Sequence, residues 1–185
     1  MSDPKAPLER QFGDVRVPVL IVTAGLPGSG KSTIAEIIAG RLGATAISVD
    51  PIEAAILKAG IDSDQPTGLA AYLVAERMAE QVLLSGHSVV VDAVNAVEPA
   101  RLQWRDLAER CGVKLRVVET VCFDDELHEQ RLAKRSGLIA AYAVEQSVEE
   151  YAEWKGAAAS LPRVTLDTSR PLGENVDAAL AFLER

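Results

Sequence analysis

Cysteine is scarce in this sequence: Cys111 and Cys122 are the only two among 185 residues. Two thiols are too few for a disulfide framework, and their spacing matches no metal-binding pattern. Free cysteines are usually buried as small hydrophobic side chains. We therefore expect both thiols in the core of a cytoplasmic protein.

Long apolar runs, aromatic residues and positive charge are also in short supply. No apolar run approaches the roughly 18 residues of a membrane helix, and residues 1–16 form a polar leader without the apolar segment of a signal peptide. Aromatic residues make up 4%, and 27 acidic against 19 basic residues give a formal net charge of -8. This balance argues against a membrane or a nucleic acid as partner.

One motif in the sequence is diagnostic. Residues 25–33 read Gly-Leu-Pro-Gly-Ser-Gly-Lys-Ser-Thr and fit the pattern G-x-x-x-x-G-K-[ST]. A buried-strand pattern precedes them and a helical pattern follows, which is the context that a phosphate-binding loop (P-loop) requires. Glycines allow consecutive backbone amides to face one anion. We predict that a nucleoside triphosphate binds through Gly25, Pro27, Gly28, Ser29, Gly30, Lys31, Ser32 and Thr33.

Individual residues of this site receive specific roles. We expect the catalytic Lys31 to reach the β- and γ-phosphates and the Ser32 hydroxyl to bind Mg²⁺. Asp167 and Thr168 follow the last predicted strand, where an adenine could be held. The predicted ligands are therefore ATP and Mg²⁺.

Strand and helix patterns alternate along the chain. They predict strands at residues 17–23, 44–49, 88–91, 114–123 and 163–166, and helices at residues 32–42, 51–58, 69–85, 97–111, 124–135, 139–159 and 174–183. Such alternation is typical of a parallel sheet with helices on both faces. We predict one α/β domain over residues 17–185, a P-loop NTPase three-layer sandwich with about five parallel strands and a small lid near residues 131–140.

Two acids, Asp50 and Asp92, follow predicted strands, and ligands of parallel sheets bind beyond the carboxyl ends of the strands. An acceptor hydroxyl needs a carboxylate to take its proton, and Mg²⁺ prefers oxygen ligands. We predict Asp50 as the catalytic base and Asp92, with Ser32, as a metal ligand, although exchanged roles are also consistent. A structural alternative for Asp50 is a helix cap, because Asp50-Pro51-x-Glu53 is a favourable helix start.

Arg131 and Arg135 lie four residues apart in a predicted helix and share one face. An anion between them would offset their repulsion, and the transferred phosphoryl group is such an anion. We predict that both are catalytic and that Arg131 also binds the nucleotide, with Ser136 and Gly137 at the hinge of the lid. The alternative is that these cations complement the dipole of a helix that opens with acidic residues.

Other side chains receive structural interpretations. Asn95 has the spacing of a helix cap, with a glutamate three residues later, and we favour this over a substrate contact. Arg101 and Arg105 share a helix face that we interpret as solvated. His128 is interpreted as a surface residue and Met78 as part of the core.

The sequence resembles the small P-loop kinases, most of all the predicted ATP-dependent kinases grouped with chloramphenicol phosphotransferase and zeta-toxin-like proteins. Gluconate and shikimate kinases are more distantly similar. The resemblance implies that Asp50 lies by the acceptor hydroxyl, that Arg131 and Arg135 contact phosphates, and that residues 166–171 form the edge of the base site. It rests on residues 25–33, 48–50, 89–93 and 129–135.

Two positions depart from the pattern of that group. Its members often carry a threonine and an aromatic residue where Val94 and Asn95 stand here, and an arginine where residues 51–57 contain none. Both positions line the acceptor side in the group.

These observations predict an ATP-dependent kinase that phosphorylates a hydroxyl of a small molecule. Alternatives are a polynucleotide 5′-hydroxyl kinase and a nucleotide-binding regulator or toxin-like protein whose output is a partner contact. No pattern names the acceptor or indicates an oligomeric state.

Overall fold

The computed structural model describes residues 17–134 and 151–185. The predicted leader, Arg135, and the part of the predicted lid from residue 135 onward lie outside the described residues. The elements along the chain are β1 (Val19–Ala24), α1 (Lys31–Leu42), β2 (Thr45–Ser48), α2 (Val49–Lys58), α3 (Thr67–Leu84), β3 (Val89–Asp92), α4 (Glu98–Cys111), β4 (Lys114–Val121), α5 (Asp125–Ala133), the 3₁₀ helix η2 (Gly156–Ser160), β5 (Arg163–Asp167) and α7 (Leu172–Leu183).

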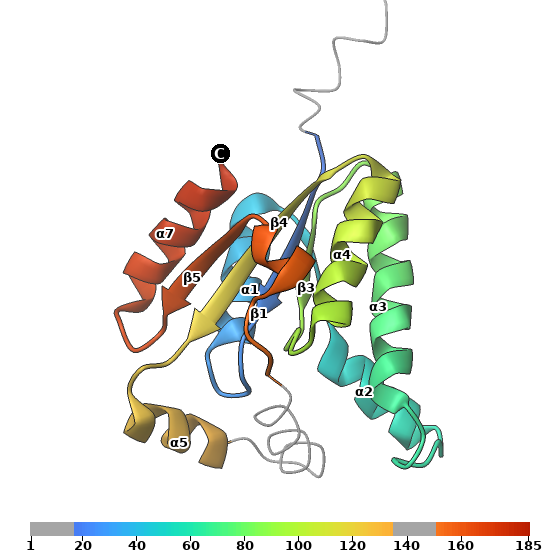
Figure 1. Ribbon diagram of the computed structural model, residues 1–185, viewed down its shortest axis with the longest axis horizontal. Helices are drawn as coiled ribbons and strands as arrows, with labels where there is room; N and C mark the ends of the chain where they lie inside the picture. The colour runs from blue at the N-terminus through green and yellow to red at the C-terminus, as the bar shows by residue number, and fades with distance from the viewer. Residues whose placement is uncertain (1–16, 135–150) are drawn as a thin grey trace, which may run out of the picture.

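The five strands form one parallel sheet in the order β2-β3-β1-β4-β5, which confirms the predicted fold class (Figure 1). Because β1 is the central strand, the loop that follows it opens at the middle of the sheet's carboxyl edge. The register pairs Ser48 with Asp92, so the ends of β2 and β3 meet at that same edge. This topology brings the strand-end residues of distant segments together.

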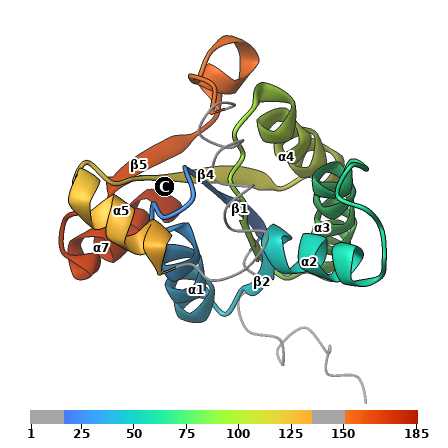
Figure 2. The ribbon, with the colours of Figure 1, turned by 90° about the horizontal axis from the view of Figure 1, so that it is seen from below.

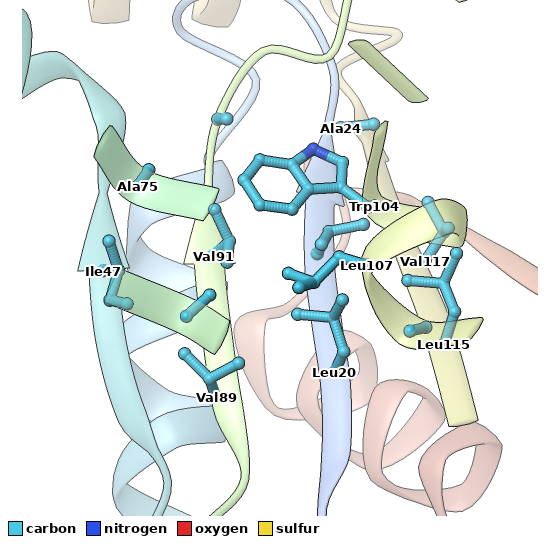
Figure 3. Close-up of a cluster of buried hydrophobic side chains, with 14 of the residues drawn as sticks. Leu20, Ala24, Ile47, Ala75, Val89, Val91, Trp104, Leu107, Leu115 and Val117 are labelled. Carbon is cyan, nitrogen blue, oxygen red and sulfur yellow. The ribbon is translucent and has the colours of Figure 1, made fainter. Parts of the chain in front are cut away.

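Helices cover both faces of the sheet, as the predicted three layers require (Figure 2). Side chains alternate along β1, so Leu20 and Val22 face α3 and α4 while Ile21 faces α1 and α7. Trp104 and Leu107 of α4 are fully buried over the strands (Figure 3). The strands therefore read as continuous apolar runs because both of their faces are buried.

The start of α2 corrects one expectation. The helix begins at Val49 rather than at Pro51, and its N-cap is Ser48 in extended conformation, without a side-chain cap. Asp50 is therefore the second helical residue and not the cap. Pro51 is tolerated there because amides of the first turn have no partner within the helix. The carboxylate of Glu53 does not cap the helix either, since it accepts a hydrogen bond from the Thr67 hydroxyl at 2.8 Å.

The predicted helix at residues 139–159 is wrong in its described part. Residues 151–155 form no regular element, and only the 3₁₀ helix η2 follows. The backbone groups here are engaged elsewhere: the Arg101 guanidinium donates to the carbonyl oxygens of Ala152 and Glu153, and the Ala152 amide donates to Ala96 O. Contacts distant in the sequence thus override the local helical composition.

The expectation that Met78 is a core residue is also wrong. The buried face of α3 consists mainly of alanines, Ala71, Ala75 and Ala79, whose small side chains let the helix approach the sheet closely. Met78, three residues after Ala75, lies beside this buried stripe and is 48% exposed.

Both cysteines are half-buried rather than fully buried, which corrects their assignment to the core. Cys111 packs against the edge of the core at the end of α4. No helix among the described residues is both long enough and apolar enough to cross a bilayer.

Candidate functional site

The loop between β1 and α1 has the backbone that the P-loop motif predicts. Gly25, Gly28 and Gly30 all have positive φ values, 137°, 80° and 87°. At Gly25 an added Cβ would lie 2.2 Å from the carbonyl oxygen of Thr120. Only glycine fits there, because both the conformation and the space exclude a side chain.

Side chains of the loop stabilise its backbone conformation. The Ser29 hydroxyl hydrogen bonds the Thr120 hydroxyl at 2.7 Å, which ties the loop to the end of β4. Lys31 is buried, and its ammonium donates to the Leu26 carbonyl oxygen at 2.9 Å. The N-cap of α1 is Gly30, which has no side chain to occupy the first amides of the helix. Those amides and the helix dipole favour an anion at this point.

The two predicted strand-end acids lie together on one side of the loop. Asp50, Asp92 and Ser32 line the same cavity of about 370 Å³. The Asp92 carboxylate accepts hydrogen bonds from the hydroxyls of Thr23 (3.1 Å) and Ser48 (3.3 Å). These bonds fix Asp92 between β1 and β2, with the P-loop serine in the same hollow.

A hydroxyl and a carboxylate in one cavity fit Mg²⁺, which usually takes one or two protein oxygens and fills its other positions with phosphate and water. The described residues hold no group of three or more His, Cys, Asp or Glu side chains that could bind a metal by themselves. Any metal here would therefore depend on the bound phosphates.

A second cavity, of about 480 Å³, opens on the other side of the loop. Its lining includes Gly28, Gly30, Lys31, Ser32, Thr33, Leu127, Arg131, Thr168 and Arg170. The Arg131 guanidinium donates to the Thr168 hydroxyl at 2.7 Å and to its carbonyl oxygen at 3.0 Å. The structure thus brings Arg131 and Thr168 together beside the P-loop, while Arg135 lies outside the described residues.

The Asp167 carboxylate is engaged by the turn that follows β5, and its predicted contact with the base stays a prediction. This carboxylate accepts hydrogen bonds from the hydroxyl (2.6 Å) and the amide (3.0 Å) of Ser169, and Asp167 is not among the residues that line the cavity. These bonds hold the pKa of Asp167 below its ordinary value. The side chain therefore shapes the turn that carries Thr168.

His128 is the clearest residue that sequence reasoning missed. Its Nε2 lies 2.7 Å from the carbonyl oxygen of Pro27, inside the P-loop, so it is not a simple surface residue. A carbonyl can only accept, which makes Nε2 the donor. The available signal was its spacing of three residues from Arg131, which places the two side chains on one face of α5.

Asn95 is neither a helix cap nor an exposed substrate contact. The N-cap of α4 is Val97, whereas Asn95 is 1% exposed and has a φ of 50°. Its amide nitrogen Nδ2 donates to the Thr23 carbonyl oxygen at 2.5 Å, and its Oδ1 accepts from Trp104 Nε1 at 2.7 Å. Its backbone amide donates to the Tyr72 hydroxyl at 2.9 Å.

Tyr72, whose hydroxyl accepts this hydrogen bond, is also influenced by the strand-end acids. Burial, together with the negative charges of Asp50, Asp92 and Glu53, raises the pKa of Tyr72 to about 12. The hydrogen bond from Asn95 acts in the opposite direction but is outweighed. The phenol therefore remains neutral beside the strand-end acids.

Arg101 corrects the expectation of a solvated helix face. It is 2% exposed, and its guanidinium donates to the carbonyl oxygens of Asn95 and Ala96 as well as to residues 152 and 153. It also lies 4.0 Å from the centre of the Trp154 ring. Arg105, by contrast, forms ion pairs with neighbouring acids at the surface.

Comparison with protein families gives a match that spans most of the chain. Residues 20–154 match the AAA domain family (AAA_33). Over 84 residues the chain is 37% identical to the uncharacterized protein Rv2004c of Mycobacterium tuberculosis (strain H37Rv), and this stretch covers 40% of the chain and 17% of that protein. Mb2027c of Mycobacterium bovis gives the same values. The chain therefore matches less than a fifth of the length of these curated relatives.

Solved structures of P-loop kinases share the fold, and so does Kti12, a relative that is not a kinase. A sugar kinase from Janibacter sp. HTCC2649 aligns with a TM-score of 0.69 at 19% identity, over 91% of this chain and 95% of that chain. The Mycobacterium tuberculosis APS kinase CysC, in complex with AMPPNP and APS, gives 0.63 at 20% identity, over 91% and 98%. Kti12 of Chaetomium thermophilum, in complex with ADP-AlF3, gives 0.70 at 20% identity, over 89% and 97%.

Proposed function

This protein belongs to the family of AAA domains (AAA_33), which its residues 20–154 match, and we propose that it is an ATP-dependent kinase. In this proposal it transfers the γ-phosphoryl group of ATP to a hydroxyl of a small-molecule acceptor. Nucleotide complexes of proteins with this fold, one with AMPPNP and one with ADP-AlF3, support the choice of nucleotide.

One observation carries the proposal: the P-loop residue Ser32 and the acids Asp50 and Asp92 line a single cavity. The Lys31 and Ser32 end of a P-loop is where the terminal phosphate of a nucleotide lies. An acceptor hydroxyl that enters this cavity would meet a carboxylate and a phosphoryl group together. Phosphoryl transfer is accelerated mainly by such positioning and by charge stabilisation.

The acceptor oxygen forms a bond to the γ-phosphorus while the bond from that phosphorus to the bridging oxygen breaks, and ADP leaves. The proton of the hydroxyl passes to Asp50, or to Asp92 if the two acids exchange roles. Lys31 and Arg131 stabilise the negative charge on the transferred group, and Arg135 is proposed as a further donor.

Ser32 and Asp92 would hold Mg²⁺, which when bound neutralises charge on the phosphates. Thr168 and Arg131 are proposed to border the nucleotide on the side of the larger cavity. Asp167 contributes there by holding the turn that presents Thr168, since its carboxylate bonds Ser169.

The test is transfer of label from [γ-³²P]ATP to a panel of hydroxyl compounds, with separation of the products. We expect a labelled organic phosphate from the wild type in Mg²⁺, and none when EDTA removes the metal. Asp50→Asn should still bind ATP but should lose transfer, because the amide cannot take the proton. Asp106→Asn, an exposed acid on α4, is the matched control and should transfer normally.

Three results would contradict the proposed mechanism or the proposed activity. Near-normal transfer by Asp50→Asn would remove this residue from the mechanism, and the same test applies to Asp92→Asn. ATP-dependent binding of a protein partner, without any labelled organic product, would favour a nucleotide switch. Label on the 5′ end of an oligonucleotide would favour a polynucleotide kinase.

A further inference from the structure

Two carbonyl oxygens of the P-loop accept hydrogen bonds from side chains outside the loop. His128, on α5, donates through Nε2 to Pro27 O at 2.7 Å. Thr168, after β5, shares the one proton of its hydroxyl between Ser29 O at 2.9 Å and Val121 O at 3.1 Å. The donors lie far along the chain from the loop, so only the fold brings them to it.

Each of these bonds also determines the direction of an amide. The peptide unit is planar and trans, so its carbonyl and its N–H point to opposite sides, and the described chain contains no cis peptide bond. When Pro27 O is held by His128, the N–H of Gly28 is turned away from α5. In the same way, the bond from Thr168 to Ser29 O turns the N–H of Gly30 away from Thr168.

The packing around Gly28 leaves little room for this peptide unit to rotate. A Cβ built on Gly28 would lie 3.0 Å from His128 Cδ2 and 3.0 Å from a methyl group of Leu132. Helix α5 therefore lies directly against the loop at Gly28. A rotation of the Pro27–Gly28 peptide would both break the bond to His128 and displace side chains of the helix.

The same helix face carries a second link to the loop. Arg131, three residues after His128, donates to the Thr168 hydroxyl, which in turn donates to Ser29 O. Two routes thus run from α5 to the carbonyls of Pro27 and Ser29, two residues apart in the loop. Amides that face inward are what a bound phosphate needs.

We propose that His128 is a positioning residue for the triphosphate: by binding the Pro27 carbonyl it fixes the Gly28 amide in the direction that donates to a phosphate oxygen. This inference rests on the proposed binding of ATP by the P-loop. His128 itself is not assigned any contact with the nucleotide. Its effect is exerted through the loop backbone, so it should act on ligands that carry phosphates and not on the nucleoside.

The test compares three variants in the binding of AMPPNP and of adenosine. His128→Phe removes the donor but keeps an aromatic ring, and His128→Gln retains an N–H donor. His87→Phe is the matched control, because His87 is the only other histidine of the chain and is exposed. In His128→Phe the loss of one oriented hydrogen bond to a charged phosphate should lower the affinity for AMPPNP by about 10- to 100-fold. Adenosine binding should change by less than about twofold, since it lacks the phosphate acceptor.

A role in general stability alone would give a different pattern. In that case His128→Phe would lose affinity for AMPPNP and adenosine equally, or only its melting temperature would fall. Either result would overturn the proposal. Partial recovery of AMPPNP affinity by His128→Gln is expected. Equal affinities of His128→Phe and His87→Phe for AMPPNP would also overturn the proposal.

The inference can be decided even if the wild type binds no AMPPNP, a result that would refute the proposed function by itself. The residual dipolar coupling of the Gly28 N–H, measured by NMR without ligand, reports the direction of that bond. We expect it to change in His128→Phe and to stay unchanged in His87→Phe. An unchanged coupling in His128→Phe would overturn the inference independently of ATP.

Discussion

Replacement of Asn95 by alanine offers a strong test of how the site is held together. The side chain joins the end of β1, through Thr23, to Trp104 of α4, and it does so in a fully buried position. Alanine would leave the Trp104 N–H and the Thr23 carbonyl without these partners. Since Trp104 is 0% exposed, water cannot easily replace the lost acceptor.

The expected loss can be estimated from these contacts. Each buried group left without a partner costs about 1–3 kcal/mol, and a residue with a Cβ at a φ of 50° costs roughly 1–2 kcal/mol. For the two groups and the backbone together the sum is about 3–8 kcal/mol in the free energy of unfolding, a large fraction of the roughly 5–15 kcal/mol that stabilises a typical domain. We therefore expect Asn95→Ala to be among the more damaging single changes in the chain.

Urea unfolding followed by far-ultraviolet circular dichroism would measure the loss. Asn95→Gly removes the same hydrogen bonds without the Cβ and should be less destabilised than Asn95→Ala by about 1 kcal/mol. Trp104→Phe removes the donor, so in the Asn95→Ala background it should cost less than it does alone. A loss below about 1 kcal/mol in Asn95→Ala would refute the reasoning, because it would mean that the buried partners find other bonds.

Three further predictions concern the P-loop, the nucleotide side and the acceptor side. Gly25→Ala should lower the melting temperature and abolish binding of an ATP analogue, because its Cβ would collide with Thr120 O; normal binding would contradict the fit argued for the loop. Arg131→Ala should reduce phosphoryl transfer far more than nucleotide affinity, and equal modest losses would indicate a role only at the helix terminus. Between pH 10 and about 12 the unfolded chain loses the Tyr72 proton while the folded protein keeps it, so stability should fall as the pH rises through this window. Tyr72→Phe should show a shallower decline in the same urea measurements, and an equal decline would contradict the raised pKa.

Local patterns in the sequence predicted the parts of this protein that depend on neighbouring residues. The P-loop was predictable because its backbone conformation requires glycines at fixed positions. The strands were predictable because a parallel sheet covered on both faces needs continuous apolar runs. Asp50 and Asp92 were predicted beside the P-loop because parallel strands end at one edge, and the structure brings them into one cavity with Ser32.

The errors arose where a distant contact outweighs a local preference. Arg101 occupies a helix position that periodicity alone assigns to solvent, yet carbonyl groups more than 50 residues away in the chain bury it. The same interaction draws residues 151–155 out of the helix that their composition favours. Asn95 tolerates a positive φ better than most residues, but its hydrogen-bonding partners Thr23 and Trp104 cannot be identified from spacing.

The P-loop shows how local sequence patterns and contacts from distant parts of the chain combine. Its motif specifies which amides exist and allows them to curl, but a peptide unit that flips leaves the sequence pattern unchanged. The direction of the Gly28 and Gly30 amides depends on what binds the preceding carbonyls, and those donors are His128 and Thr168. Neither donor belongs to the motif, and both come from elements beyond β4. A chain could therefore keep every residue of the motif and still lose phosphate affinity through a change in α5 or in the turn after β5.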